Sequence, residues 1–411
     1  MTKLLIIAPQ NPYPAKDGGK IGIYYPVIHL TKYFQIHFAF ITPHEVTSDV
    51  YDHFKKHNIS IYPQLINTKD SVFGYLLNIT SSLPYKFQKY CSPTILKRLD
   101  AICKKEEINN IWCNHSHVAW YGLELKKRRG ATIFLREHNI EYSLVHQVMK
   151  VQMNPLLKTF VRYQYLKTKK FEIQCWNSFE KTFFISDSDL ALATKNLNEE
   201  KCVLLYDSFS EKKETADKSN ETVNVLKEPY SFIFTASIET FQNLYNLQKF
   251  ISEIWQPLIA KDNRWKLYIT GNRQEVLEKK LKLDLNRNNI KNLGFVDNIQ
   301  RAIASTKYFI SPTYIGSGLR IKVLNAIAQG AVSFVTPIDL KMIKIFKDGF
   351  NIIKFDDFED FYSKLLRLEE DNALYEQISV QAVQVGSTFS WSKYVDIVYN
   401  EVAQVESFTG R

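Results

Sequence analysis

The sequence lacks the long apolar segments and paired cysteines that mark several common protein classes. No apolar run approaches the ~18 residues that span a membrane, and the first run, Leu4 to Ala8, is too short for the hydrophobic region of a signal peptide. The cysteines (91, 103, 113, 175 and 202) form no CxxC pair, and their odd number fits a reduced compartment better than a disulfide framework. We therefore expect a cytoplasmic protein whose first apolar run is a buried strand.

Acidic residues are missing from a segment that otherwise suggests anion binding. None occurs between Asp297 and Asp339, a stretch that contains SPTYIGSGLRIKVLNAIAQG (311–330). Its small-residue turn precedes a predicted helix with Arg320 and Lys322 in the first turn. Helix N-termini favour anions, by up to ~2 kcal/mol in a partly buried site. The turn could hold a phosphate, which Arg320 would grip in a fork and Lys322 would contact as a point charge. An ordinary helix start with two solvated cations is the alternative.

Positive charge is concentrated in the first half of the chain. Residues 1–190 contain 25 Lys and Arg against 15 Asp and Glu, whereas residues 191–411 contain 28 of each, so the whole net charge of +10 lies in the first half. Such a surface favours an anionic partner. Residues 155–172 resemble a basic amphipathic helix, which favours the inner face of an anionic membrane; an ordinary packed helix is equally compatible. Nucleic acid is disfavoured, because no stacking platform or helix-turn-helix pattern accompanies the charge.

Strand-like and helix-like runs alternate in two consecutive blocks. The first contains runs at 4–9, 36–42, 109–115, 131–137 and 182–186; the second contains runs at 231–237, 266–271, 291–296, 307–312 and 331–337, with a helix predicted over 243–260. This pattern predicts two doubly wound α/β domains, at 1–208 and 230–388. We expect 209–229 to be a linker and 389–411 to contain a helix that packs back on the first domain. Because open parallel sheets bind ligands at the carboxyl ends of their strands, the two sets of loops should share one cleft.

Two further motifs follow predicted strands of the first block. The DGGK loop (17–20) could cradle an anion, since Gly18 and Gly19 let the backbone approach a ligand closely; a plain strand-to-helix connection is the alternative. In LREHNIEYS (135–143), His138 could donate a hydrogen bond to a substrate or move a proton near neutral pH. A loop histidine with ion-paired neighbours is the alternative there.

Cys113, His115 and His117 alternate, so on a strand they would share one face. Soft and imidazole ligands on one face are compatible with zinc. No fourth ligand is evident and the spacing matches no strong zinc pattern, so we favour a histidine that lines the cleft over a metal site.

Taken together, these segments resemble the retaining glycosyltransferases of family 4, which have two facing Rossmann-like domains (the GT-B fold). The resemblance covers nearly the whole chain. It is carried by LLIIAPQNPYPAKDGGK, LREHNIEYS, TASIETFQNLYNLQKFISEIWQPL, GSGLRIKVLNAIAQG and the late FSW. It implies that a nucleotide-sugar binds mostly on the second domain. Its sugar would contact the first domain, where the acceptor also binds, often at a membrane surface.

The resemblance also implies roles for individual residues. Gly18 and Gly19 would approach the diphosphate or the acceptor, and His138 matches a histidine that contacts the donor sugar near the reacting carbon. Arg320 and Lys322 would stabilise the leaving diphosphate as its charge grows. The remaining candidates are Gly316, Ser317, Gly318, Leu319, Asn325, Gly271 and Asn243 for the donor, and Asp17, His117 and Glu141 for the acceptor. No metal or cofactor is expected, since the nucleotide-sugar is a substrate.

The sequence departs from the family pattern of two glutamates separated by seven residues. The second position is Asn325, and the first is Ser317 by spacing or Ile315 if the glycines are aligned. The second glutamate ordinarily holds the ribose hydroxyls; an asparagine carbonyl accepts such a bond for a net ~1 kcal/mol rather than ~1.5–3 kcal/mol. Two functions therefore remain open. One is a glycosyltransferase, using UDP-sugar as the commonest donor, in bacterial surface polysaccharide or glycolipid synthesis. The other is a catalytically silent relative that acts as a binding or scaffold subunit.

Overall fold

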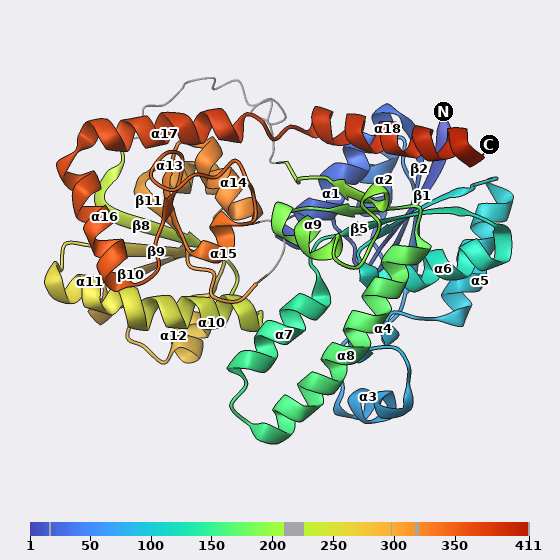
Figure 1. Cartoon of the computed structure of the whole chain (residues 1–411), viewed down its shortest axis with the longest axis horizontal. Coiled ribbons are helices and arrows are strands. Elements are labelled where there is room, and N and C mark those ends of the chain that lie inside the picture. The colour runs from blue at the N-terminus through green and yellow to red at the C-terminus, as the bar shows by residue number, and fades with distance from the viewer. Residues whose placement is uncertain (16–17, 209–225, 297, 317–319, 410–411) are drawn as a thin grey trace. The chain divides into compact units, whose positions relative to one another are not determined.

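The computed structural model describes residues 1–15, 18–208, 226–296, 298–316 and 320–409. The chain divides into two compact units (Figure 1). Unit 1 contains the described residues of Met1–Asp207 and Trp391–Arg411, and unit 2 those of Ser208–Gly316 and Arg320–Ser390. Each unit is built on one parallel sheet flanked by helices, which confirms the predicted α/β class with two doubly wound domains.

The sheet of unit 1 has seven strands in the order β3-β2-β1-β4-β5-β6-β7, and every neighbouring pair is parallel. The chain first adds strands on one side of β1 and then, from β4 onward, on its other side. The strands are β1 (Thr2–Ala8), β2 (Phe34–Thr42), β3 (Ser60–Leu65), β4 (Asn110–Asn114), β5 (Thr132–Glu137), β6 (Lys181–Phe184) and β7 (Cys202–Leu204).

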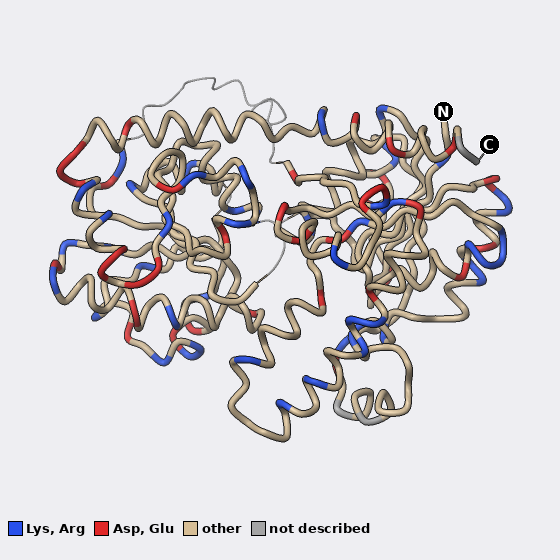
Figure 2. Tube along the Cα trace, viewed as in Figure 1, with Lys and Arg blue, Asp and Glu red and all other residues tan. Residues whose placement is uncertain are grey.

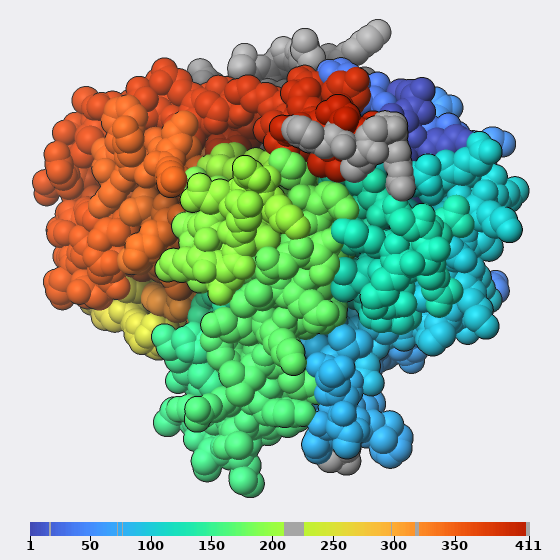
Figure 3. Space-filling model, turned by 45° about the vertical axis from the view of Figure 1, so that its right-hand side comes forward, coloured from blue at the N-terminus to red at the C-terminus, as the bar shows by residue number. Residues whose placement is uncertain are grey.

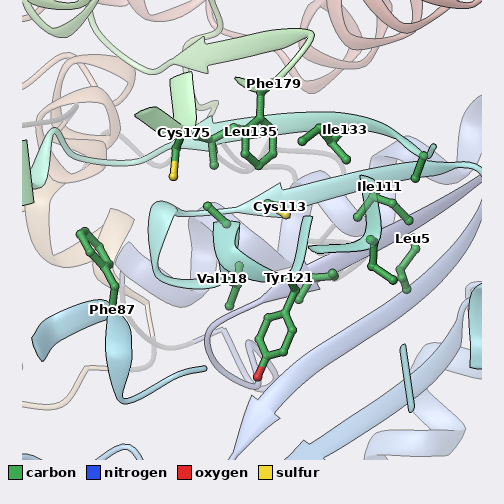
Figure 4. Close-up of a cluster of buried hydrophobic side chains, with 14 of the residues drawn as sticks. Leu5, Phe87, Ile111, Cys113, Val118, Tyr121, Ile133, Leu135, Cys175 and Phe179 are labelled. Carbon is green, nitrogen blue, oxygen red and sulfur yellow. The ribbon is translucent and has the colours of Figure 1, made fainter. Parts of the chain in front are cut away.

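Both faces of this sheet are buried, which explains why its strands read as continuous apolar runs. Leu4 and Ile6 of β1 enter one core, which also receives side chains from α1 (Gly18–His29), α2 (Ser48–Lys56) and α18 (Trp391–Thr409). Leu5 and Ile7 enter the other, formed with α5 (Pro93–Lys105), α6 (Ala119–Arg129) and α8 (Pro155–Ser178). Figure 4 shows this second core, where Leu5, Ile111, Ile133 and Leu135 gather with Tyr121, Cys175 and Phe179.

The described part of unit 1 also has four further helices. They are α3 (Val72–Leu77), α4 (Tyr85–Gln88), α7 (Glu141–Val151) and α9 (Asp187–Ala193), and 3-10 turns lie at Leu30–Lys32, Asn78–Thr80, Ser116–Val118 and Glu199–Lys201. α7 and α8 form a hairpin that extends away from the sheet, with α3 beside α8 (Figure 1). No helix among the described residues is both long and apolar enough to cross a membrane.

Unit 2 has a six-stranded parallel sheet in the order β10-β9-β8-β11-β12-β13. Its strands are β8 (Glu228–Thr235), β9 (Lys266–Thr270), β10 (Ile290–Gly294), β11 (Thr306–Ser311), β12 (Val332–Val335) and β13 (Ile353–Lys354). The helices are α10 (Phe241–Phe250), α11 (Gln256–Lys261), α12 (Gln274–Leu281), α13 (Ile299–Ala304), α14 (Ile321–Ala328), α15 (Pro337–Leu340), α16 (Phe358–Glu370) and α17 (Asn372–Gly386), with a 3-10 turn at Asn286–Asn288.

The helix predicted over 243–260 is confirmed as a continuous helical run from α10 to α11. It includes a π-helical turn at Ile251–Trp255. Leu247, Ile254, Trp255 and Leu258 from this run are buried in the core of unit 2, as their helical spacing indicates.

The last helix, α18, is part of the core of unit 1. Val398 is fully buried there, whereas its neighbour Ile397 is 37% exposed.

We expect Val398→Ala to lower the free energy of unfolding by about 1–3 kcal/mol, because a cavity forms and buried methyl contacts are lost. Ile397→Ala is the matched control and should change it by less than about 0.5 kcal/mol. Urea unfolding followed by tryptophan fluorescence measures both, and equal effects would contradict this packing of α18.

Candidate functional site

In each sheet the strand order reverses beside the first strand of the unit, between β1 and β4 and between β8 and β11. Ligands of open α/β sheets bind outside the carboxyl ends of the strands at such a reversal. The polar residues described below lie at these carboxyl edges, in the loops and helix starts that follow β1, β4 and β5 in unit 1 and β8 and β11 in unit 2.

A buried ion pair lies at the centre of the unit 1 edge. Arg136, the penultimate residue of β5, is fully buried and pairs with Asp207, which follows β7 and is 1% exposed. Its guanidinium also donates to the carbonyl of Gly22 on α1 and lies 5.3 Å from the ring centre of Tyr394 on α18. The pair therefore connects two strands, β5 and β7, and two helices, α1 and α18, at one point. Sequence reasoning did not assign either residue.

His138 packs directly on this pair. Its Nε2 lies 2.8 Å from Arg136 Nη1 and 2.9 Å from Asn114 Oδ1, and its ring stacks on His115 at 3.8 Å between centroids. Burial, followed by the nearby Arg136 charge, lowers the pKa of His138 well below its usual value. A neutral ring can hydrogen-bond a substrate, and the two roles considered from the sequence stay predictions.

His115 has an uncommon backbone conformation, φ 88° and ψ 145°. A non-glycine residue at positive φ costs on the order of 1–3 kcal/mol, and such residues cluster at ligand sites. The conformation ends β4 at Asn114, and Ser116–Val118 form a 3-10 turn. The prediction that Cys113, His115 and His117 share a strand face is therefore wrong.

The ring of His117 lies 5.8 Å from that of His115, and 5.3 and 5.2 Å from those of Phe87 and Tyr90. Desolvation lowers its pKa well below the usual value, as it does for His115. Within the described part of the chain, no group of three or more His, Cys, Asp or Glu side chains has the arrangement of a metal site.

The glycine that approaches the histidine closely is Gly22. A Cβ at this position would lie 2.9 Å from His138 Cε1 and 3.3 Å from Asp207 Oδ2. Gly18 and Gly19 are exposed and begin α1, and a Cβ at Gly18 would meet nothing within 4 Å. Their predicted contact with a ligand is compatible with this open position and stays a prediction. Asp17 lies outside the described residues.

Three glutamates are buried beside this edge. Ser116 Oγ and Trp176 Nε1 donate to the two carboxyl oxygens of Glu137, at 2.6 and 2.9 Å. Glu172, on α8, accepts from the backbone N–H groups of Glu141 and Tyr142, at 2.8 and 2.7 Å. It therefore caps the N-terminus of α7 from another helix, which fixes the loop that carries His138.

Glu141 forms an ion pair with Lys86. The Lys86 side chain is 44% exposed, whereas the three glutamates are at most 3% exposed. The predicted role of Glu141 in acceptor binding would require it to keep or exchange this partner.

The unit 2 edge contains the two cations predicted from the sequence. Arg320 precedes α14, and its Nε lies 3.6 Å from Oδ1 of Asp339, a buried residue of α15. Asp339 also accepts from Ser311 Oγ at 2.6 Å and from Thr313 Oγ1 at 2.8 Å. The segment 298–338 contains no acidic residue, and the carboxylate that pairs with Arg320 comes from the next α-helix, α15. Asp339 thereby orients Arg320 over Gly316. The guanidinium is so close that a Cβ at Gly316 would meet its Nη2 at 1.6 Å.

Lys322 is the second cation. Its ammonium lies 4.7 Å from the ring centre of Phe234. Desolvation, and then the charge of Arg320, lowers the pKa of Lys322 to about 8. A charge that is poorly solvated and repelled by a neighbouring cation is a strong site for an anion, because the anion restores the lost solvation.

Asn246, which sequence reasoning missed, positions the turn before these cations. This buried side chain accepts from the N–H groups of Tyr314 and Ile315, at 2.9 and 3.0 Å, and donates to the carbonyl of Ile315 at 2.9 Å. It lies on α10, three residues after the predicted donor residue Asn243. The sequence contained a signal for it, because residues three apart share a helix face and Asn246 lies on the same face of α10 as Asn243.

The other predicted donor residues lie on several elements of unit 2. Asn243 donates to the carbonyl of Ser237 at 2.7 Å, and so holds the loop after β8. Gly271 has φ 85° at the end of β9, which requires glycine. Asn325 is half-buried on α14, one turn after Lys322. Ser317, Gly318 and Leu319 lie outside the described residues.

Comparison with known proteins concerns the domain and the fold. Residues 229–371, most of unit 2, match the family model described as Glycosyl transferases group 1. This part of unit 2 is therefore similar to a group 1 glycosyltransferase domain. No curated protein matches the sequence.

Solved structures match over nearly the whole chain. HepE of Anabaena, in complex with UDP and glucose, has a TM-score of 0.66 at 11% identity, over 98% of this chain and 100% of its own. Sucrose-phosphate synthase from Thermosynechococcus elongatus has a TM-score of 0.70 at 10% identity, over 98% and 99%. WaaG, a glycosyltransferase involved in lipopolysaccharide biosynthesis, has a TM-score of 0.63 at 12% identity, over 96% and 99%. At these low identities, the TM-scores show a shared fold. That fold is GT-B, as predicted.

The buried glutamates give unit 1 a defined pH dependence. Desolvation raises the pKa of Glu137 to about 7 from an ordinary 4.5, and the pKa of Glu172 is raised as well. Between pH 4.5 and about 7, these two carboxyl groups bind more protons in the folded state than in the unfolded state, so their own contribution to stability falls as the pH rises. We expect Glu137→Gln to reduce the slope of unfolding free energy between pH 5 and 7, by at most about 1.4 kcal/mol per pH unit. Urea unfolding at several pH values measures this. The exposed Glu239→Gln is the control, and an identical slope in both variants would exclude a raised pKa.

Proposed function

We propose that this protein is a glycosyltransferase that moves a sugar from a nucleotide-diphosphate sugar to a glycan or lipid-linked acceptor. The observation that carries the proposal is the pair of cations at the carboxyl edge of the group 1 glycosyltransferase domain, with Arg320 oriented by Asp339 and Lys322 poorly solvated. UDP is the nucleotide we expect, since a structure of the same fold contains UDP and glucose.

The cations would act on the leaving group. When the bond between the anomeric carbon and the diphosphate oxygen breaks, its electron pair stays on that oxygen and negative charge grows there. Arg320 can donate two parallel hydrogen bonds to phosphate oxygens, and Lys322 adds a point charge. Because Asp339 already orients the guanidinium, little reorganisation is needed as the charge develops.

The acceptor hydroxyl would complete the transfer. Its oxygen bonds to the anomeric carbon, and its proton passes to an oxygen of the leaving phosphate. We propose retention of configuration, with attack from the face that the diphosphate leaves, on the basis of the resemblance to family 4. The neutral, buried His138 would hydrogen-bond a hydroxyl of the donor sugar from the unit 1 edge. No metal or cofactor is part of this proposal.

Asn325 would contact the ribose in place of the family glutamate. Its carboxamide can accept a hydrogen bond from one hydroxyl without charge assistance, so donor affinity should be reduced and turnover retained. For the biological role we propose synthesis of a bacterial surface polysaccharide or glycolipid. Two observations support it: WaaG, of the same fold, acts in lipopolysaccharide biosynthesis, and the first half of this chain carries all of the net positive charge. Residues 155–172 are the proposed contact with an anionic membrane.

The nucleotide site can be tested by calorimetric titration with UDP, GDP, ADP and CMP. We expect selective binding of one diphosphate, and at least about 100-fold weaker binding by Arg320→Ala/Lys322→Ala, because two charge-assisted contacts worth about 1.5–3 kcal/mol each are removed. Lys341→Ala removes an exposed cation of the same unit and should bind as wild type. If the folded wild type binds no nucleotide, the catalytically silent scaffold becomes the better explanation.

His138 can be tested once a donor sugar is known. We expect His138→Ala to lower kcat by about 10- to 1,000-fold, because a contact near the reacting carbon is removed. UDP affinity should stay near wild type, since UDP lacks the sugar. An unchanged kcat at saturating donor would remove His138 from the reaction.

A further inference from the structure

Exposed apolar side chains gather at the free end of the α7–α8 hairpin and on the adjacent α3. Met153 and Leu156 are 91% and 81% exposed, and Phe73 and Leu77 are 69% and 59% exposed. Leu157 and Ile79, at 51% and 52%, lie beside them in sequence. Figure 3 shows these two segments together as a lobe that projects from unit 1. We call residues 71–80 and 150–163 the apolar tip.

The α3 part of the tip is held firmly by its inner side. A Cβ at Gly74 would lie 2.6 Å from the ring of Tyr85, so the helix packs on this ring as closely as a backbone can. Tyr75 stacks on the same ring at 3.9 Å and meets Phe160 of α8 at 5.6 Å. Phe73 and Leu77 therefore stay outward because the opposite side of α3 is fixed.

Asn78 joins the two parts of the tip through polar contacts. It is fully buried, accepts from Gln164 Nε2 at 2.9 Å, and receives Lys167 Nζ on its backbone carbonyl at 2.8 Å. Tyr163 donates to the carbonyl of Ile79 at 2.5 Å. The polar groups of Asn78 are thus satisfied inside the tip, while Met153, Leu156, Phe73 and Leu77 are exposed outside it.

The charges around the tip have one sign. Residues 71–99 contain no Asp or Glu, and residues 142–178 contain six Lys and Arg against a single carboxylate, Glu172, which is fully buried. Exposed cations flank the apolar side chains: Lys150, Lys158 and Arg162. Figure 2 shows Lys and Arg, and no Asp or Glu, toward the free end of the hairpin.

We propose that the apolar tip inserts into an anionic lipid bilayer. Its apolar side chains would enter the boundary between headgroups and acyl chains, while the flanking cations pair with lipid phosphates. This narrows the contact proposed along 155–172 to the start of α8 and adds α3 to it, because Thr168, Phe171 and Cys175 in the C-terminal half of α8 are buried. A second copy of the chain is a poorer occupant, since two tips would bring like charges together.

The experiment is sedimentation of the whole protein with vesicles, in the absence of any donor. Its outcome is therefore independent of the proposed glycosyl transfer. Vesicles of phosphatidylcholine alone and with 30% phosphatidylglycerol are compared at low salt and at about 0.5 M salt, where charge is screened. We expect binding to the anionic vesicles at low salt, with a measurable part retained at high salt because apolar insertion does not depend on ionic strength.

Two pairs of substitutions test the apolar residues. Met153→Ser/Leu156→Ser and Phe73→Ser/Leu77→Ser should each lower the partition coefficient by about 10- to 100-fold, since each removes two apolar side chains from the inserted surface. Leu366→Ser/Val380→Ser is the control, because these side chains are 41% and 52% exposed on unit 2. All six positions are exposed, so the variants should fold as wild type.

Three outcomes would overturn the proposal. One is no binding of the wild type to anionic vesicles. The second is binding that high salt abolishes completely and that neither tip variant weakens. Such binding would be purely electrostatic, without apolar insertion. The third is self-association in vesicle-free buffer that both tip variants abolish and that competes with lipid, which would assign the tip to an interface between copies.

Discussion

A charge that leaves water must find a partner, and this constraint organises both edges of the protein. Arg136 is fully buried and pairs with Asp207, while Arg320 is oriented by Asp339, itself held by Ser311 and Thr313. An unpaired buried ion costs several kcal/mol, so each pair constrains the strands and loops that deliver it. In unit 1 these are the ends of β5 and β7 and the start of α1. In unit 2 they are the end of β11 and the beginnings of α14 and α15.

The sequence predicts the framework well, because its strongest signals are local. Parallel strands that are buried on both faces read as continuous apolar runs, and the long helix of unit 2 shows its 3.6-residue period. Arg320 and Lys322 could be placed at a helix start from the preceding small-residue turn alone. The predicted boundaries err at strand ends, as at 109–115, where the positive φ of His115 ends the strand at Asn114.

The partners of the buried charges could not be predicted, because they are distant in sequence. Asp207 lies 71 residues after Arg136, and Asp339 reaches Arg320 only after β12 has been added to the sheet. An arginine inside an apolar strand does signal a buried partner, but it does not say which carboxylate. The same holds for Glu172, whose position on the mixed basic and apolar α8 gives no sign that it caps α7. The inference that Cys113, His115 and His117 share one face failed because it assumed an unbroken strand, whereas β4 ends at Asn114.

α8 is one helix with two different ends. Leu156 and Leu157 are exposed near its start, and Glu172, fifteen residues after Leu157, holds the loop that carries His138. At a rise of about 1.5 Å per residue, this helix separates the two by roughly 22 Å. α8 is therefore a spacer of fixed length. Whatever surface the start of α8 rests on, the length of this helix limits how far above that surface the His138 loop can stand, and so how long a substrate anchored there must be to reach it.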